Sequence, residues 1–227
     1  MNFDVKNLWV INIGGTEVWI TETIFNVWLV MGFIIISAII IRIVMGKAKE
    51  IPTGVQNFIE MVVEFFDGML KNAVGEKFMF LGNWFFTVFI FILISNFSGM
   101  LGLRPPTADW ATTFALAFAT FFLIHSLGLV YRRGEYLKGF ISPNPIFLPL
   151  NIIGELALPV SLSFRLFGNI LSGMILLGLL YSMAPIFLRF IVPIPLHAYF
   201  DLFSGAIQTY VFCMLSMTFV GASISDS

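Results

Sequence analysis

The sequence predicts an all-α integral membrane protein with about five membrane-embedded helices and one amphipathic helix at the membrane surface. Of its 227 residues, 59% are hydrophobic and only 11% are charged, and the mean hydropathy is +0.96. Soluble domains carry about 25% charged residues, so this composition is typical of proteins that lie in a lipid bilayer. The apolar residues also gather in runs long enough to cross about 30 Å of hydrocarbon. With a net charge of −1 the chain lacks a basic surface, and we expect no nucleic-acid partner.

Five spans are expected in these apolar runs. Three prolines, Pro185, Pro193 and Pro195, divide the last run, because proline removes a backbone donor and disfavours helix in the residue before it. That run therefore forms a hairpin of two long helices. We expect a single membrane domain, 1–227, with an external segment at 1–21 and spans at 22–45, 83–103, 111–131, 144–184 and 193–223. No basic segment with a short apolar core precedes the first span, so we expect that span to remain as an anchor.

The segment 53–72, between the first two spans, is amphipathic. Its apolar residues recur at helical spacing, and Glu60, Glu64 and Asp67 fall on the opposite side. We interpret it as a helix that lies on the membrane surface or packs against a partner, rather than as a span.

Lysine and arginine residues predict the orientation of the chain, since they favour the cytoplasmic side of a membrane. If the N-terminus lies outside, eight of the 12 basic residues are cytoplasmic: Arg42, Lys47, Lys49, Lys71, Lys77, Arg132, Arg133 and Lys138. Lys6, Arg104 and Arg189 then lie outside, and Arg165 lies within the membrane. We therefore expect an external N-terminus and a cytoplasmic C-terminus.

A few charged or strongly polar residues interrupt the last two spans: Glu155, Arg165, Asn169, Asp201 and Gln208. A charge at the bilayer centre costs about 2.5–3.5 kcal/mol on insertion scales, so such residues indicate function. Roughly 20 residues of apolar helix flank Arg165 on each side, which places it too deep to reach the interface easily. Ser161 and Asn169 share its face of the helix by their spacing.

The two acids lie on opposite sides of the arginine. At a rise of about 1.5 Å per residue, Glu155 lies about 15 Å to the cytoplasmic side of Arg165. If Gln208 is level with Arg165, Asp201 lies about 10 Å toward the outside. Arginine keeps its proton, whereas both acids can lose theirs. We hypothesise that each acid lines a vestibule open to one face, that the guanidinium blocks direct passage, and that a carboxylate on a moving partner carries the ion past it.

Several motifs resemble those of one family of membrane proteins. They are RLFGN at Arg165–Asn169, NIIGE at Asn151–Glu155, ISNFSGMLGLRPPTAD at Ile94–Asp109 and AIQTYVF at Ala206–Phe212. In this order, and over nearly the whole chain, they resemble subunit a of the bacterial-type F-type ATP synthase, the static half of its membrane motor.

The resemblance implies a function, partners and a location. Such a subunit provides two offset half-channels that pass protons to and from a rotating ring of c subunits, which couples ion flow to ATP synthesis or hydrolysis. It is not catalytic alone. Its partners would be the c ring, the peripheral-stalk b subunits and, indirectly, the F1 sector, in the plasma (inner) membrane of a bacterium. The family fold also implies that the last two helices are long and strongly tilted.

The resemblance also implies roles for individual residues. Arg165 would face the essential carboxylate of the ring, with Asn169 beside it and Gln208 on the facing helix. The ion path would further include Glu155, Ser161, Asp201 and Asn96.

Two positions depart from the family pattern. Many members carry an acid or a histidine nine positions after the arginine, and a histidine or glutamate seven positions before the glutamine. Here these positions are Met174 and Asp201, so we expect Asp201 alone to serve the outer half-channel. Some relatives carry an acid where Gly99 stands, and the outer route is therefore expected to use Asn96, Asp201 and water.

Three alternatives stay open. The first is a secondary transporter whose arginine and aspartate bind an anionic substrate, although we find no internal repeat. The second is the membrane anchor of a redox complex, in which His125 and His197 would bind haem; we interpret both as packed or interfacial residues rather than proton relays. The third is a sodium-coupled version of the same motor, since no acid in this chain distinguishes H⁺ from Na⁺. We expect no cofactor and no metal site.

Overall fold

The computed structural model describes residues 7–13, 16–46, 48, 51–141, 144–183, 185, 189 and 191–224. Within them, five helical segments are long and apolar enough to cross a membrane: Glu22–Met45, Glu76–Leu101, Trp110–Tyr131, Pro145–Met183 and Pro193–Ile224. The predicted fold class and number of spans are therefore confirmed. The basic residues Lys6, Lys47 and Lys49, which enter the predicted orientation, lie outside the described residues.

Local side-chain caps begin two of the spans. Helix α1 (Glu22–Met45) starts after Thr21, whose hydroxyl accepts a hydrogen bond from the backbone N–H of Ile24. Helix α4 (Trp110–Tyr131) starts after Asp109, whose carboxylate accepts from the backbone N–H of Ala111. The second span is helix α3 (Gly82–Phe97). The 3₁₀ turn Glu76–Leu81 precedes it and the 3₁₀ turn Ser98–Leu101 follows it.

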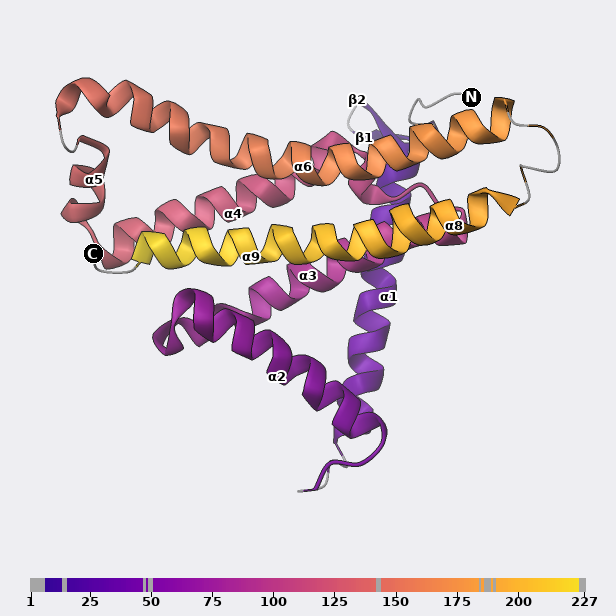
Figure 1. The fold of residues 1–227 in the computed structure, drawn as a ribbon, viewed down its shortest axis with the longest axis horizontal. Coiled ribbons are helices and arrows are strands. Elements are labelled where there is room, and N and C mark those ends of the chain that lie inside the picture. The colour runs from indigo at the N-terminus through magenta and orange to yellow at the C-terminus, as the bar shows by residue number, and fades with distance from the viewer. Residues whose placement is uncertain are drawn as a thin grey trace.

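The last two spans are long and built in pieces. The 3₁₀ turn Pro145–Phe147 precedes α6 (Leu148–Met183). Helix α8 (Pro193–His197) continues through a π-helical stretch (Ala198–Ser204) into α9 (Gly205–Ile224). The 36 residues of α6 extend over about 54 Å, far more than a perpendicular crossing requires. In Figure 1, α6 and α9 lie crosswise to α1, as expected of strongly tilted helices. The separations of about 15 and 10 Å therefore run along the helices, and the corresponding differences in depth are smaller.

Helix α9 lies at the centre of the bundle. It runs antiparallel to α6, and α3 and α4 pack along it (Figure 1). Half of the most apolar stretch of Pro193–Ile224, the segment that includes α9, is buried, against 6% for α1, which is mostly uncovered by the rest of the chain. The core joins Phe85 of α3, Leu166 of α6 and Met217 of α9. A side-chain hydrogen bond joins α1 to this bundle: the Asn26 amide donates to the carbonyl of Arg104 at 2.9 Å.

The amphipathic helix α2 (Val55–Val74) divides its apolar face between the bundle and the surroundings. Phe66, Leu70 and Val74 are buried in the core, whereas residues nearer its start, such as Phe58, are exposed. The buried half lies very close to α9: a Cβ added at Gly221 would come within 2.1 Å of the Ala73 carbonyl oxygen. Helix α2 therefore packs against its own chain at one end.

Two further elements do not follow from the sequence analysis. The first is an antiparallel hairpin of β1 (Asn7–Ile13) and β2 (Thr16–Thr21), so the segment expected outside the membrane is not helical. Its strands are rich in Trp, Val and Ile, which favour strands, and the two residues between them in sequence are glycines. The second is a short helix, α5 (Gly134–Ile141), which follows α4.

Candidate functional site

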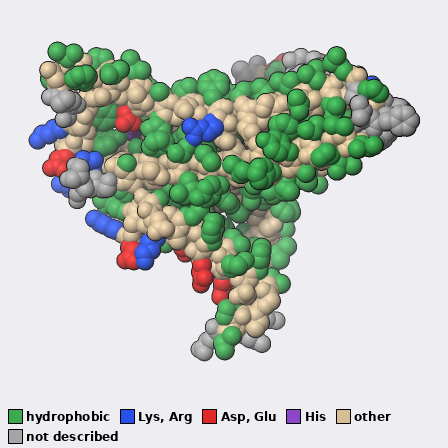
Figure 2. All heavy atoms as spheres, in the orientation of Figure 1, with side chains coloured by type: hydrophobic (Ala, Val, Ile, Leu, Met, Phe, Trp, Pro, Cys, Tyr) green, Lys and Arg blue, Asp and Glu red, His purple; other side chains and the backbone are tan. Residues whose placement is uncertain are grey.

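Arg165 lies on the exposed face of α6. It is the one basic residue of this helix, and Figure 2 shows basic atoms over α6 within a largely apolar surface. The neighbouring ring of Phe164 is exposed as well. Among the described residues the ion pairs are Lys71–Glu76 and His197–Asp201, and Arg165 takes part in neither. The guanidinium therefore presents a positive charge outward, on a face that its own chain does not cover.

A hydrogen bond between α6 and α9 sets the level of Arg165. The hydroxyl of Ser204, which ends the π-helical stretch, donates to Asn169 Oδ1 at 2.8 Å. Because the two helices are antiparallel, one turn from Asn169 toward the start of α6 leads to Arg165, and one turn from Ser204 into α9 leads to Gln208. Arg165 and Gln208 therefore lie at about the same level. The amide nitrogens of Asn169 and Gln208 are buried and have no hydrogen-bond acceptor among the described residues. Two polar donors thus accompany the arginine on this side of the bundle.

A cavity of about 560 Å³ lies near the first part of α6. Glu155 and Asn151 of α6, Tyr136 of α5 and Arg132 line it. It shares Gly154, Leu158 and Phe219 with a narrower groove of about 260 Å³, which is lined further on by Ser161 and Arg165. The predicted residues Glu155, Ser161 and Arg165 therefore line one continuous depression.

Helix α5 covers part of this inner cavity and is held by two side-chain contacts. The Tyr136 hydroxyl and His125 Nδ1 are 2.5 Å apart, and the Asn151 amide donates to the Phe140 carbonyl at 2.8 Å. Burial, and then the nearby Glu155 carboxylate, raise the pKa of Tyr136 to about 12. Tyr136 therefore stays neutral at physiological pH. Sequence analysis missed this residue because no local pattern brings α5 over α6.

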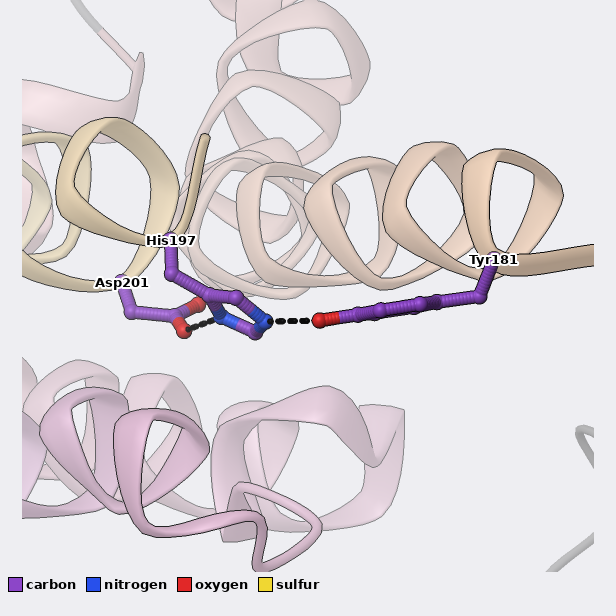
Figure 3. Close-up of polar contacts among 3 residues, drawn as sticks. All are labelled: Tyr181, His197 and Asp201. Atoms are coloured by element: carbon purple, nitrogen blue, oxygen red, sulfur yellow. Dashed lines mark hydrogen bonds and ion pairs between the residues drawn. The ribbon is translucent and has the colours of Figure 1, made fainter. Parts of the chain in front are cut away.

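Asp201 lies at the other end of the helix pair, within the π-helical stretch, and is buried at 9% exposure. Its Oδ2 lies 2.6 Å from His197 Nδ1, and His197 Nε2 lies 3.4 Å from the Tyr181 hydroxyl of α6 (Figure 3). His197, which we interpreted as packed or interfacial, thus also contacts the acid, and Asp201 is accompanied by a second ionisable group. That Asp201 alone serves the outer half-channel stays a prediction. The i, i+4 spacing of the pair was visible in the sequence, whereas nothing there indicated Tyr181.

Gly99 packs directly on the Asp201 carboxylate. A Cβ at residue 99 would lie 3.2 Å from the Cγ and both carboxylate oxygens of Asp201. The backbone of the turn Ser98–Leu101 therefore closes one side of the Asp201 carboxylate. A side chain at residue 99 would compete with this carboxylate for the same space.

Asn96 does not join this polar pair in the structure. It is fully buried, and its amide donates to the Gly205 carbonyl at 3.0 Å and to the Thr209 hydroxyl at 3.2 Å. Its Oδ1 accepts a hydrogen bond from Thr107 at 2.7 Å. These bonds use both amide donors and connect α3, α9 and the turn Pro106–Ala108, so Asn96 has a structural role. Its expected place in the outer route stays a prediction.

The fold and site define a multi-pass membrane protein with a cavity toward each end of its longest helix pair and an exposed arginine between them. Comparison with known sequences agrees. The sequence model of the ATP synthase A chain family matches residues 24–221. The chain belongs to this family.

Individual relatives are similar over most of the chain. The sodium ion specific ATP synthase subunit a of Propionigenium modestum is 36% identical over 92% of this chain and 75% of its own. The chloroplastic subunit a of Oedogonium cardiacum is 36% identical over 90% of this chain and 83% of its own. That of Stigeoclonium helveticum is 35% identical over 90% of this chain and 85% of its own.

Proposed function

We propose that this chain is the stator subunit a of an ATP synthase Fo sector and that it passes protons to and from a rotating ring of c subunits through two offset half-channels. One observation carries the proposal. Arg165 is exposed on α6, lacks an ion-pair partner among the described residues, and lies between the depression that holds Glu155 and the pair His197–Asp201. Such a charge needs an acid from outside the chain.

The face around Arg165 suits a ring of helices that moves past it. Beside the arginine, this face consists of exposed apolar side chains of α6 and α9, including Phe164, Ile207 and Tyr210. A ring carboxylate would stay protonated against lipid and ionise beside the guanidinium, because a nearby positive charge favours the ionised form. A proton can then leave through one half-channel and return through the other only after the ring has turned.

The cavities support two half-channels. The inner route runs from the mouth near Arg132 past Glu155 and Ser161 to Arg165. The outer route passes Asp201 and reaches the level of Arg165 through Ser204 and Asn169. Arg165 keeps protons from moving directly between them, since a fixed positive charge repels a positive ion.

Orientation and partners complete the proposal. The start of α1 and the α3–α4 connection lie on one side of the membrane domain, where the Asn26 amide donates to the Arg104 carbonyl. Arg132 and Ser223 line the inner cavity on the other side. With the second side cytoplasmic, as its basic residues indicate, the N-terminus is outside and the C-terminus inside. We place the protein in a bacterial plasma membrane, with b subunits as further neighbours and the F1 sector, which carries out the ATP chemistry, as an indirect one.

Substituting the arginine tests this function. In inverted vesicles that contain the whole complex, Arg165→Ala should abolish ATP-driven proton pumping, measured by quenching of a pH-sensitive dye. Arg42→Ala removes an exposed arginine at the end of α1 and should pump at the wild-type rate. Pumping by an assembled Arg165→Ala complex would refute the proposal.

A sodium-coupled motor is the second candidate function. The observation in its favour is the 36% identity to the subunit a of Propionigenium modestum, which is named sodium ion specific. Uptake of ²²Na⁺ by the same vesicles, driven by ATP in the presence of a protonophore, would distinguish this candidate from proton pumping.

A further inference from the structure

The polar group at the outer end of the helix pair has a defined order. A cavity of about 580 Å³ is lined by His197, Tyr181 and Arg189, together with apolar residues. Asp201 does not line this cavity and is 9% exposed. Its carboxylate lies 2.6 Å from His197 (Figure 3). The Gly99 backbone closes another side of the carboxylate. The imidazole therefore stands between the cavity and the acid.

The two ring nitrogens of His197 face different groups. Nε2 lies 3.4 Å from the Tyr181 hydroxyl, on the side of the cavity, and Nδ1 lies 2.6 Å from Asp201 Oδ2. Neutral imidazole has one N–H and one free lone pair, so it can gain a proton at one nitrogen and lose one from the other. A hydronium ion arriving through the cavity would give a proton to Nε2 and leave a water, while the Nδ1–H bond breaks and Asp201 Oδ2 takes that proton. The ring is left as the Nε2–H tautomer, and rotation of the ring with proton exchange between its nitrogens through water restores the starting Nδ1–H form.

This arrangement admits a proton and opposes a metal cation. An imidazole passes on a proton by exchanging N–H bonds, but it has no equivalent exchange for Na⁺. Arg189 also lines this cavity. Among the described residues, the Tyr181 hydroxyl also faces His197, and the backbone at Gly99 faces Asp201. A sodium ion in the cavity would therefore meet an imidazole that has no means of passing it on to Asp201.

We propose that His197 is the proton relay between the outer cavity and Asp201, and that it makes the outer route selective for protons over sodium ions. The proposal rests on the proposed function, because Asp201 serves an ion path only if the chain conducts ions.

Two variants of His197 separate a relay from a positioning role. His197→Ala removes the ring, and His197→Gln keeps an amide that can hold Asp201 by a hydrogen bond but cannot exchange protons. Both should lower ATP-driven proton pumping by about tenfold or more in vesicles with the whole complex. Arg42→Ala, an exposed residue outside both routes, is the control and should pump at the wild-type rate. Wild-type pumping by His197→Gln would overturn the relay, because positioning alone would then suffice.

Chemical rescue provides a readout that a structural residue would not give. Added imidazole should restore part of the pumping of His197→Ala, because the cavity of about 580 Å³ admits it. Pyrrole, which has a similar size but no basic nitrogen, should not. Failure of imidazole, or equal rescue by pyrrole, would overturn the proposal. Uptake of ²²Na⁺ by the wild-type complex would overturn the selectivity.

The two proposals fail in different ways. Normal pumping by Arg165→Ala removes the proposed function itself. Loss of pumping in Arg165→Ala together with normal pumping in His197→Ala removes only the relay.

Discussion

Asp201 and Gly99 show how one position can depend on another that is distant in sequence. The carboxylate of Asp201 fills the space where a side chain at residue 99 would begin, with only 3.2 Å between them. A glycine at residue 99 therefore leaves room for the acid at 201. The family resemblance, which includes members with an acid at the position of Gly99, fits a single carboxylate site that either helix can supply.

Moving the carboxylate between these two positions tests that idea. Asp201→Asn should lower ATP-driven proton pumping by about tenfold without loss of assembly. Gly99→Asp added to this variant should restore part of the rate, because the new side chain begins 3.2 Å from the old carboxylate. The initial rate of dye quenching in inverted vesicles measures both effects. A double variant no faster than Asp201→Asn would show that the two positions do not supply a common site.

At the scale of elements, close packing around α9 places the site. Gly221 brings α2 against α9, and Gly205 lies beside Asn96, where a Cβ would come within 3.0 Å of the Asn96 Cβ. The π-helical stretch Ala198–Ser204 precedes this packed helix and carries Asp201. Turns of this kind are rare and frequently occur at functional sites, because an extra residue per turn changes the direction of the side chains that follow.

Filling the gap between α2 and α9 should destabilise the protein. Gly221→Ala places a methyl group 2.1 Å from the Ala73 carbonyl oxygen, so one helix must move. We expect a loss of about 1–3 kcal/mol and a lower Tm in detergent. Gly32→Ala in α1 is the matched control: nothing lies within 4 Å of its new methyl group, and the Tm should stay the same or rise. Equal Tm values for the two variants would contradict this close packing.

At the scale of the whole molecule, the outer and inner cavities lie near opposite ends of the pair α6–α9. Figure 2 shows basic and acidic side chains gathered near α5 and α2, while much of the visible surface is apolar. This distribution suits a protein whose charged end lies in the cytoplasm and whose remaining face meets lipid and a ring of helices.

Cysteine labelling tests the proposed orientation. The one native cysteine, Cys213, is fully buried, and Cys213→Ser provides the background. In that background, Leu101→Cys should react with a membrane-impermeant thiol reagent in right-side-out vesicles only. Arg133→Cys should react in inverted vesicles only, because both positions are exposed but lie on opposite sides. The reverse pattern would invert the assignment of inside and outside.

The sequence by itself determined the five spans and the amphipathic character of α2, because both depend on local hydrophobicity and its period. It also singled out Arg165, since a charge in an apolar helix is costly wherever the helix packs. Only the tertiary structure decided how polar side chains pair. It joined His197 to Asp201 and Tyr181, brought Tyr136 over the cavity of Glu155, and enclosed Asn96 in a hydrogen-bonded network. Such pairings depend on the direction in which each side chain points, and that direction is fixed by packing between segments far apart in the chain.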